Sequence, residues 1–104
     1  MSGGVKQIPH KLRITDRAAA LLRTLHPNIK KKVRASFHAI MTDPYAGKAL
    51  TEELSGLRSY RVIRYRLIYR LVKERQIEVV AVGPRERIYE DTYRALKKER
   101  EDKG

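Results

Sequence analysis

The stretch from Leu57 to Tyr89, LRSYRVIRYRLIYRLVKERQIEVVAVGPRERIY, decides the fold. Its first half alternates apolar and arginine side chains, which is typical of β-strands with two unlike faces. The apolar set is Tyr60, Val62, Leu67, Tyr69 and Leu71, and the alternating set is Arg61, Arg66 and Arg70. Residues 73–76 form a polar connector, and residues 77–82 form a third run rich in β-branched side chains. The stretch therefore predicts three consecutive strands, with apolar side chains on one face of the sheet and guanidinium groups on the other.

The segment before this stretch begins with a short alternating pattern. Residues 11–15 alternate leucine and isoleucine with charged side chains and predict a first strand. Thr15 or Asp16 can cap the helix that follows, because its side-chain oxygen can accept from a free backbone N–H. Apolar side chains recur at helical spacing over residues 18–25, so this helix is expected to lie against the sheet.

A second helix follows a break at His26-Pro27, where proline suits the first turn of a new helix. One apolar stripe runs through residues 28–41, with most of the lysines off it. Residues 43–57 read as a connector. The prediction is a small α+β domain in which an N-terminal strand and a helical hairpin pack on a largely antiparallel sheet.

The two ends of the chain are expected to differ from its body. After Tyr89 the sequence predicts a short C-terminal helix that frays into charge. No repeat or linker divides residues 1–104, so we expect one domain. Residues 1–10 and 98–104 are expected to be flexible.

The composition narrows the function classes. The 104 residues include 24 Lys and Arg against 12 Asp and Glu, a net charge of +12, which favours nucleic acid or an acidic protein as partner. There is no cysteine, which excludes disulfides and cysteine-based zinc sites. No apolar run approaches the roughly 20 residues that span a bilayer, and nothing resembles a signal peptide. We therefore expect a cytoplasmic protein without a membrane partner.

The sequence offers few of the usual catalytic groups. Cleavage of RNA needs activation of a 2′-hydroxyl, cations around the phosphorane, and an acid for the 5′-oxygen. The histidines, His10, His26 and His38, lie away from the sheet in sequence and are more simply surface or packing residues. The carboxylates Glu74, Glu78 and Glu86 stand isolated among cations, so no metal site or other cofactor is expected. An enzyme built from this sequence would use arginine, lysine and tyrosine.

The arginines are dense enough to suggest a use. Seven of them crowd about thirty residues: Arg58, Arg61, Arg64, Arg66, Arg70, Arg85 and Arg87. Strand arginines are also common solubility devices, so a single one would indicate little. Like charges across a sheet destabilise it, however, and a cluster of them suggests a compensating ligand. Among the tyrosines, Tyr60 and Tyr69 are expected in the core, Tyr93 is expected to pack, and Tyr89 is the candidate for chemistry.

These residues carry a resemblance to a known family. The segments LSGLRSYRV, RYRLIYRL and VVAVGPRERIYE are similar to the RelE/ParE superfamily of toxins from toxin–antitoxin modules, and most similar to its RelE branch. The likeness covers roughly residues 10–97. It implies a RelE-like fold and a ribosome-dependent mRNA endonuclease that inhibits translation without a metal. It also implies an acidic antitoxin, a toxin–antitoxin hetero-oligomer, and the ribosome and mRNA as partners.

The resemblance also implies roles for single residues. Arg61 would bind phosphate or help to activate the 2′-hydroxyl, and Tyr89 would stack on or orient the base. Arg66 and Arg85 would stabilise the transition state, with Arg85 a possible acid. The other candidates for RNA binding are Arg58, Arg64, Arg70 and Arg87. One departure is Ile63, where relatives carry a basic residue in a turn that often contains glycine; a positive φ there would be strained.

Three functions fit the sequence. The first is an endoribonuclease of the RelE type. The second is a gyrase inhibitor of the ParE type, which shares the fold but acts on a protein. The third is an RNA-binding module without catalysis. The combination of Arg61, Arg66, Arg85 and Tyr89 favours the first, because RNA cleavage is the function that would require all four on one face.

Overall fold

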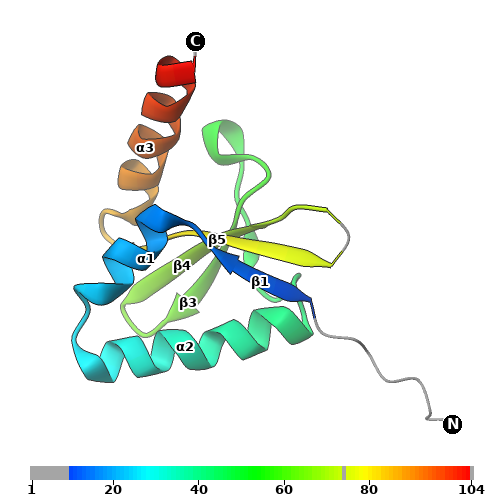
Figure 1. The fold of residues 1–104 in the computed structure, drawn as a ribbon, viewed down its shortest axis with the longest axis vertical. Coiled ribbons are helices and arrows are strands. Elements are labelled where there is room, and N and C mark those ends of the chain that lie inside the picture. Colours follow the sequence, from blue (N-terminus) through cyan, green and yellow to red (C-terminus); the bar gives the residue numbers. More distant parts are fainter. Residues whose placement is uncertain (1–9, 74, 104) are drawn as a thin grey trace, which may run out of the picture.

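The computed structural model describes residues 10–73 and 75–103. A first strand, two helices, the other four strands of a five-stranded sheet and a third helix follow one another along the chain (Figure 1). The elements are β1 (Lys11–Ile14), α1 (Asp16–Arg23), α2 (Pro27–Thr42), β2 (Lys48–Ala49), the 3-10 helix η1 (Glu52–Leu54), β3 (Arg58–Val62), β4 (Tyr65–Leu71), β5 (Gln76–Pro84) and α3 (Ile88–Lys103). This arrangement confirms the predicted α+β class.

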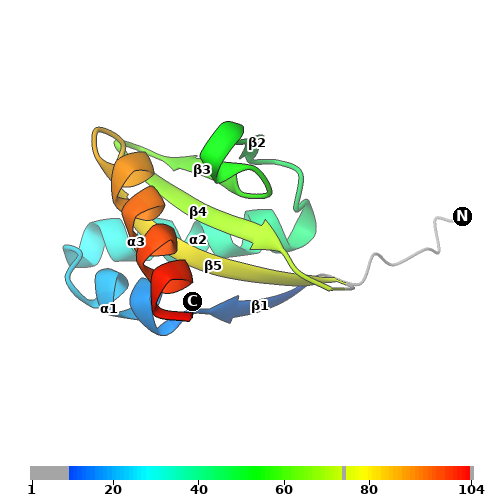
Figure 2. The same ribbon diagram turned by 90° about the horizontal axis from the view of Figure 1, so that it is seen from above.

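The sheet has the strand order β1-β5-β4-β3-β2, and Figure 2 shows these strands side by side. β1 pairs with β5 in parallel, and every other pair is antiparallel. The three strands predicted from residues 57–82 are present, and so is the first strand. β2 was missed, because a strand of two residues has no periodicity to detect.

The first two helices begin where the sequence predicts. The Thr15 side chain accepts a hydrogen bond of 3.1 Å from the Ala18 N–H and so caps α1. Pro27 occupies the first turn of α2, and the His26 Nδ1 accepts from the Asn28 N–H at 3.1 Å. His26 is therefore a capping residue, in agreement with its expected structural role.

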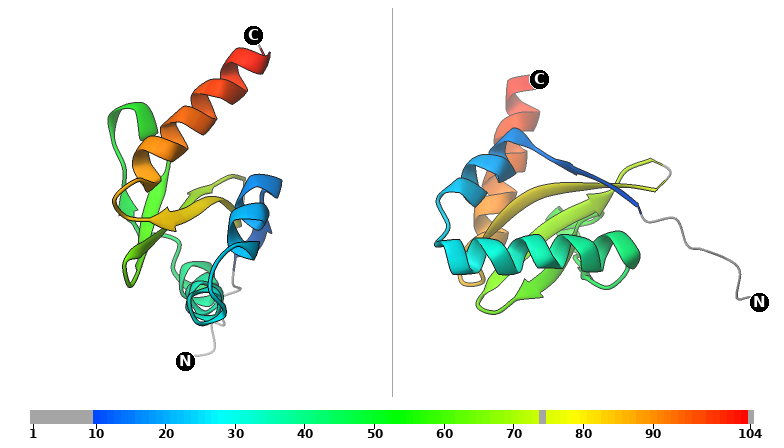
Figure 3. Two further views of the ribbon diagram at one scale, coloured as in Figure 1. Left: turned by 90° about the vertical axis from the view of Figure 1, so that its left-hand side faces the viewer. Right: turned by 60° about the horizontal axis from the view of Figure 1, so that its bottom comes forward.

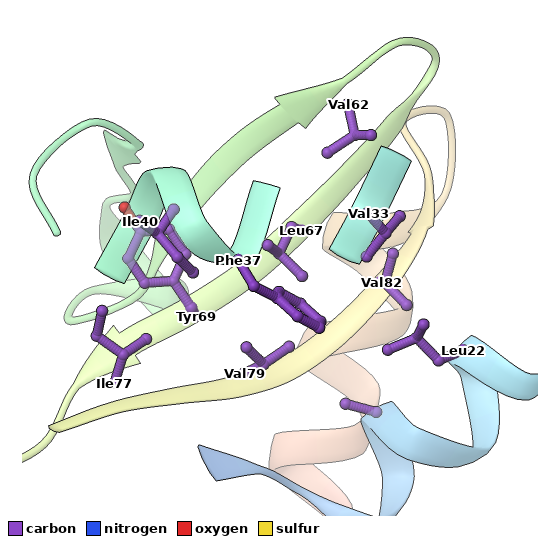
Figure 4. Close-up of a cluster of buried hydrophobic side chains, with 11 residues drawn as sticks. Leu22, Val33, Phe37, Ile40, Val62, Leu67, Tyr69, Ile77, Val79 and Val82 are labelled. Carbon is purple, nitrogen blue, oxygen red and sulfur yellow. The ribbon is translucent and has the colours of Figure 1, made fainter. Parts of the chain in front are cut away.

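One face of the sheet packs against the helical hairpin, as predicted. Val62, Leu67, Tyr69, Ile77, Val79 and Val82 form its buried centre. They meet Ala18 and Leu22 of α1 and Val33, Phe37 and Ile40 of α2 (Figure 4). We call this the hairpin face.

The opposite face corrects the prediction of a continuous arginine surface. Ile68 of β4 is fully buried there, together with Val80 and Ala81 of β5. Ile88 at the start of α3 and Leu57 close over them. We call this the α3 face, and Figure 3 shows α2 and α3 on opposite sides of the sheet. The centre of the α3 face is apolar because α3 packs over it. The arginines of this face lie near the ends of the strands.

Helix α3 is longer than the short helix predicted. It continues to Lys103, through most of the residues expected to be flexible, 98–104; Gly104 lies outside the described residues, as do residues 1–9. Beyond Leu96 the helix leaves the body of the protein, and residues 97–101 are exposed. Within the part of the chain that the structure describes, no helix has both the length and the apolar character needed to span a membrane.

Tyr69 ties the connector to the sheet. Its phenol donates a 2.7 Å hydrogen bond to the Pro44 carbonyl and accepts one of 3.0 Å from the Gly47 N–H. A Cβ at residue 47 would lie 2.6 Å from this phenol oxygen, so glycine is required for the close approach. The prediction that Tyr69 belongs to the core is confirmed, since the residue is fully buried.

We expect Tyr69→Phe to lower the free energy of unfolding by about 1–3 kcal/mol, because the buried Gly47 N–H would lose its acceptor. Urea unfolding at neutral pH measures this difference. Tyr60→Phe is the matched control, since Tyr60 is only partly buried against the same cluster. An unchanged stability in Tyr69→Phe would show that the connector does not depend on this anchor.

Tyr69 should also make the protein sensitive to alkali. Burial raises the pKa of Tyr69, although the hydrogen bond from Gly47 and the neighbouring Arg58 oppose the shift. The stabilisation is therefore complete below the unfolded-state pKa of about 10 and is lost as the pH rises towards the folded-state value. Thermal melts between about pH 9 and 11 should show a steeper loss of stability in the parent protein than in Tyr69→Phe.

Candidate functional site

Arg61 and Arg66 face each other across the β3–β4 hairpin. They are direct partners in the antiparallel register, one pair before the turn, and lie on the α3 face with Ile68. The Arg66 Nη1 donates to the Tyr65 carbonyl at 3.0 Å and to the Ile63 carbonyl at 3.4 Å. Two like charges in directly opposed positions oppose pairing, so the arrangement favours an anion that binds both.

Tyr89 joins this pair from the first turn of α3. Its phenol oxygen lies 3.0 Å from the Ser59 hydroxyl, and either group can donate. Ser59 precedes Arg61 by two residues on β3, so both point to the same face, roughly 7 Å apart along the strand. The Tyr89 ring thus reaches the α3 face beside the arginine pair while remaining 37% exposed.

Arg85 completes the group at the end of β5. Its backbone N–H donates a 2.9 Å hydrogen bond to the Arg64 carbonyl in the β3–β4 turn. Its guanidinium is exposed, and its Nε lies 3.6 Å from the Glu86 carboxylate. The four predicted catalytic residues, Arg61, Arg66, Arg85 and Tyr89, therefore gather at one end of the sheet, which we call the arginine site. Their catalytic roles remain predictions.

The predicted RNA-binding arginines fall into two groups. Arg64 lies in the β3–β4 turn and Arg87 in the turn after β5, and both are exposed beside the arginine site. Arg58 instead pairs with Tyr69 and belongs to the hairpin face. Its guanidinium donates to the Gly47 and Tyr45 carbonyls at 3.0 and 3.3 Å and lies 5.2 Å from the centre of the Tyr45 ring. Arg58 thus supports the connector and stands apart from the site.

Arg70 is separated from the arginine site in a different way. It follows Arg66 by four residues on β4, roughly 13 Å along the strand. Its Nε and Nη2 lie 2.8 and 2.7 Å from one oxygen of the buried Glu78, and Arg13 lies 3.5 Å from the other. The sequence placed Glu78 among cations, and the structure shows that two of these cations come from strands β1 and β4; Glu74 lies outside the described residues. The charge of Arg70 is already compensated.

Ser59 is a site residue that sequence reasoning missed. The signal available was its spacing of two from Arg61, which places both on one face of a strand. A lone serine in a strand is too common to attract attention. Only the position of Tyr89, set by the turn after β5, identifies its role.

The turn between β3 and β4 has the strain that the sequence suggested. Val62 pairs with Tyr65, so Ile63 and Arg64 form a two-residue turn. Ile63 has a φ of 59°, in the left-handed region, and its side chain is 48% exposed. This conformation costs a residue other than glycine roughly 1–2 kcal/mol, and the exposed side chain recovers little of that by burial.

Two cavities lie beside the arginine site but outside it. One of about 480 Å³ opens between the start of α1, β5 and α3, and one of about 240 Å³ adjoins it near Pro84. They share Arg17, Ala81 and Thr92, and the larger one is lined mostly by charged and polar side chains. None of the four predicted catalytic residues lines either cavity. Arg61, Arg85 and Tyr89 are exposed and Arg66 is half-buried, so the arginine site is accessible surface, which suits a polymer crossing it better than an enclosed small molecule.

The described residues offer no obvious metal site. Across residues 10–73 and 75–103, no three histidine, aspartate or glutamate side chains lie close enough together to hold an ion. The arrangement at the arginine site is suited to binding phosphate, because guanidinium groups stay charged and can bind two oxygens at once.

Comparison with known proteins shows which family and which solved structures this chain is similar to. Residues 12–89 match the family described as ParE toxin of type II toxin–antitoxin system, parDE. A chain of the RelBE2 toxin–antitoxin complex from Mycobacterium tuberculosis is 33% identical, with a TM-score of 0.69, over 75% of this chain and all of that one. A comparison with curated proteins finds no match.

Two more distant structures share the fold. A double arginine mutant of the E. coli toxin RelE, in the free state, is 20% identical with a TM-score of 0.70, over 88% of this chain and 98% of that one. The chromosomal ParDE system of P. aeruginosa provides a chain that is 17% identical with a TM-score of 0.57, over 72% and 95% of the two chains.

The fold and the family match together define the toxin of a type II toxin–antitoxin system. Within that class the chain belongs to the RelE/ParE superfamily, through its ParE toxin family match. The resemblance found in the sequence is thereby confirmed. Two of the similar structures, from Mycobacterium tuberculosis and E. coli, are themselves toxin–antitoxin complexes.

We expect Thr92→Val to raise the free energy of unfolding by about 1 kcal/mol. The Thr92 side chain is 2% exposed, and its hydroxyl has no hydrogen-bond partner among the described residues. Valine keeps the shape and removes the unpaired group. Urea unfolding measures the change, with Thr42→Val as control, because the exposed Thr42 hydroxyl donates to the His38 carbonyl. A loss of stability in Thr92→Val would show that the hydroxyl is satisfied in solution.

Proposed function

We propose that this toxin is a ribosome-dependent mRNA endonuclease that arrests translation. The observation that carries the proposal is the arginine site, where Arg61, Arg66, Arg85 and Tyr89 lie at the same end of the sheet. Three cations and an aromatic side chain supply what a phosphate and its neighbouring base require. Arg70, whose charge is compensated by Glu78, lies roughly 13 Å from Arg66 along β4 and is therefore separate from this group.

The proposed reaction is an in-line attack within the RNA backbone. The 2′-oxygen forms a bond to phosphorus, and the bond from phosphorus to the 5′-oxygen breaks. Negative charge builds on the non-bridging oxygens in the transition state, where Arg66 and Arg85 stabilise it. Arg61 holds the phosphate next to the 2′-hydroxyl.

The protons move in opposite directions on the two sides of the phosphate. The 2′-hydroxyl loses its proton to water as it attacks, and the 5′-oxygen gains one as it leaves. Arg85 is the proposed donor to the leaving oxygen, its guanidinium regaining a proton from water afterwards, and Tyr89 orients the base beside the cleaved bond. The Ser59 hydroxyl holds the Tyr89 phenol at 3.0 Å, ready for this contact. None of these roles requires a metal ion.

The charge of the chain supports the proposed partners. A net charge of +12 draws the protein to ribosomal RNA and to mRNA, with a strong dependence on salt. The same charge suits an acidic antitoxin that forms a hetero-oligomer with the toxin and masks the arginine site. Translation takes place in the cytoplasm, and we propose that the toxin acts there.

Gyrase inhibition is the second candidate, because the matching family carries the ParE name. A gyrase inhibitor would use its surface to bind a protein and would have no need for a phosphate site with an aromatic neighbour. The two candidates therefore differ in what Arg85 and Tyr89 contribute.

The test is primer extension on a reporter mRNA in a translating extract, comparing the parent protein with Arg85→Ala and Tyr89→Ala. We expect ribosome-dependent cuts that fall on the order of a hundredfold in Arg85→Ala, because a transition-state cation is lost. Arg34→Ala is the matched control, since Arg34 is an exposed arginine on α2. It should cut like the parent protein.

Two outcomes would overturn the proposal. Intact mRNA with translation still arrested would indicate an RNA-binding module. Intact mRNA with cleaved DNA–gyrase adducts in a supercoiling assay would indicate a gyrase inhibitor. Equal cutting of free RNA would instead remove the ribosome from the mechanism.

A further inference from the structure

The β3–β4 turn makes an unusual set of contacts with the arginine site. The carbonyl groups of its two residues and of Tyr65, the first residue of β4, all accept hydrogen bonds from site arginines. The Ile63 and Tyr65 carbonyls accept from the Arg66 Nη1, and the Arg64 carbonyl between them accepts from the Arg85 N–H. The turn therefore contacts both residues to which the proposed function assigns transition-state stabilisation.

These contacts leave one edge of the Arg66 guanidinium available. A guanidinium carries five N–H donors in a fixed plane. The bonds to the turn come from Nη1, and in the described residues neither Nε nor Nη2 has a partner. The Nε–Nη2 edge is the one that binds two phosphate oxygens in parallel. The turn thus orients Arg66 without occupying the edge that a phosphate would use.

Ile63 determines the direction of these carbonyls. Its φ of 59° sets the path of the turn, and its side chain is half exposed, so packing does not explain the choice of isoleucine. Glycine would relieve the strain, but it would also let the turn visit other φ and ψ combinations. A branched side chain has fewer alternatives, so the strained turn is also a narrowly defined one.

We propose that Ile63 is a positioning residue, whose strained backbone directs the turn carbonyls so that Arg66 and Arg85 are held in place for phosphate binding. The proposal rests on the proposed function for its effect on rate, but the orientation of Arg66 is a property of the toxin alone. On this proposal, the backbone strain at Ile63 serves to orient the two site residues that the turn contacts.

The experiment compares Ile63→Gly with Glu52→Gly in the free toxin. Glu52 is a matched control, because it is an exposed non-glycine residue with a φ of 54° that lies in η1, away from the turn. Both variants should melt a few degrees higher than the parent protein, since both lose backbone strain. Only Ile63→Gly should lower the order parameter of the Arg66 Nε–H, measured by ¹⁵N relaxation.

Cleavage provides the second readout. Ile63→Gly should lower kcat about tenfold with little change in KM, and Ile63→Val should retain the parent value because it keeps a branched side chain. Glu52→Gly should cleave normally. A kcat and an Arg66 order parameter that both stay at parent values in Ile63→Gly would overturn the proposal. If the parent toxin itself does not cleave RNA, the proposed function fails, and the relaxation measurement alone decides the role of Ile63.

Discussion

The burial of β4 on both faces is the constraint on which the rest of the structure depends. Leu67 and Tyr69 point into the helical hairpin, Ile68 points under α3, and all three are fully buried. A strand covered on both sides needs two layers of helix, so α1, α2 and α3 have to lie on opposite sides of the sheet. Charged residues of β4 can then lie only near its ends, where Arg66 and Arg70 are found. The arginine site lies at the end of the sheet because the centre of the sheet is buried in the hydrophobic core on both faces.

The same strand explains how the site is assembled from distant parts of the sequence. β4 aligns Arg66 with Arg61 on one side and Gly83 on the other, so the turns after β3 and β5 meet at one end of the sheet. A register irregularity between Ile68 and Tyr69 leaves Val80 without a partner on β4. This bulge places both Val80 and Ala81 in the core under α3. The position of Tyr89 therefore follows from the packing of the same strands that carry the arginines.

Most of the fold, and part of the site, could be predicted from the sequence. Periodicity was enough for the main strands and the first two helices, because burial of one side imposes a repeat of two or 3.6 residues. It was not enough for Ile68, since a strand buried on both faces loses its alternation, and the length of α3 was underestimated because its outer turns bury nothing. The partners of Arg58 and Glu78 could not be predicted from the sequence, for a shared reason. Their partners, the Tyr45 carbonyl and Arg13, are brought close only by tertiary structure.

Counter-charges distinguish Arg70 and Arg94 from the Arg61–Arg66 pair. Arg70 has the buried Glu78, and Arg94 has Glu90 one turn earlier on α3. In the described residues no carboxylate lies within ion-pair distance of Arg61 or Arg66, although their side chains occupy directly opposed positions. Their mutual repulsion lowers the stability of the free protein, and a bound phosphate would remove it. Folding alone gives no reason for such a pair, whereas the binding of a polyanion does.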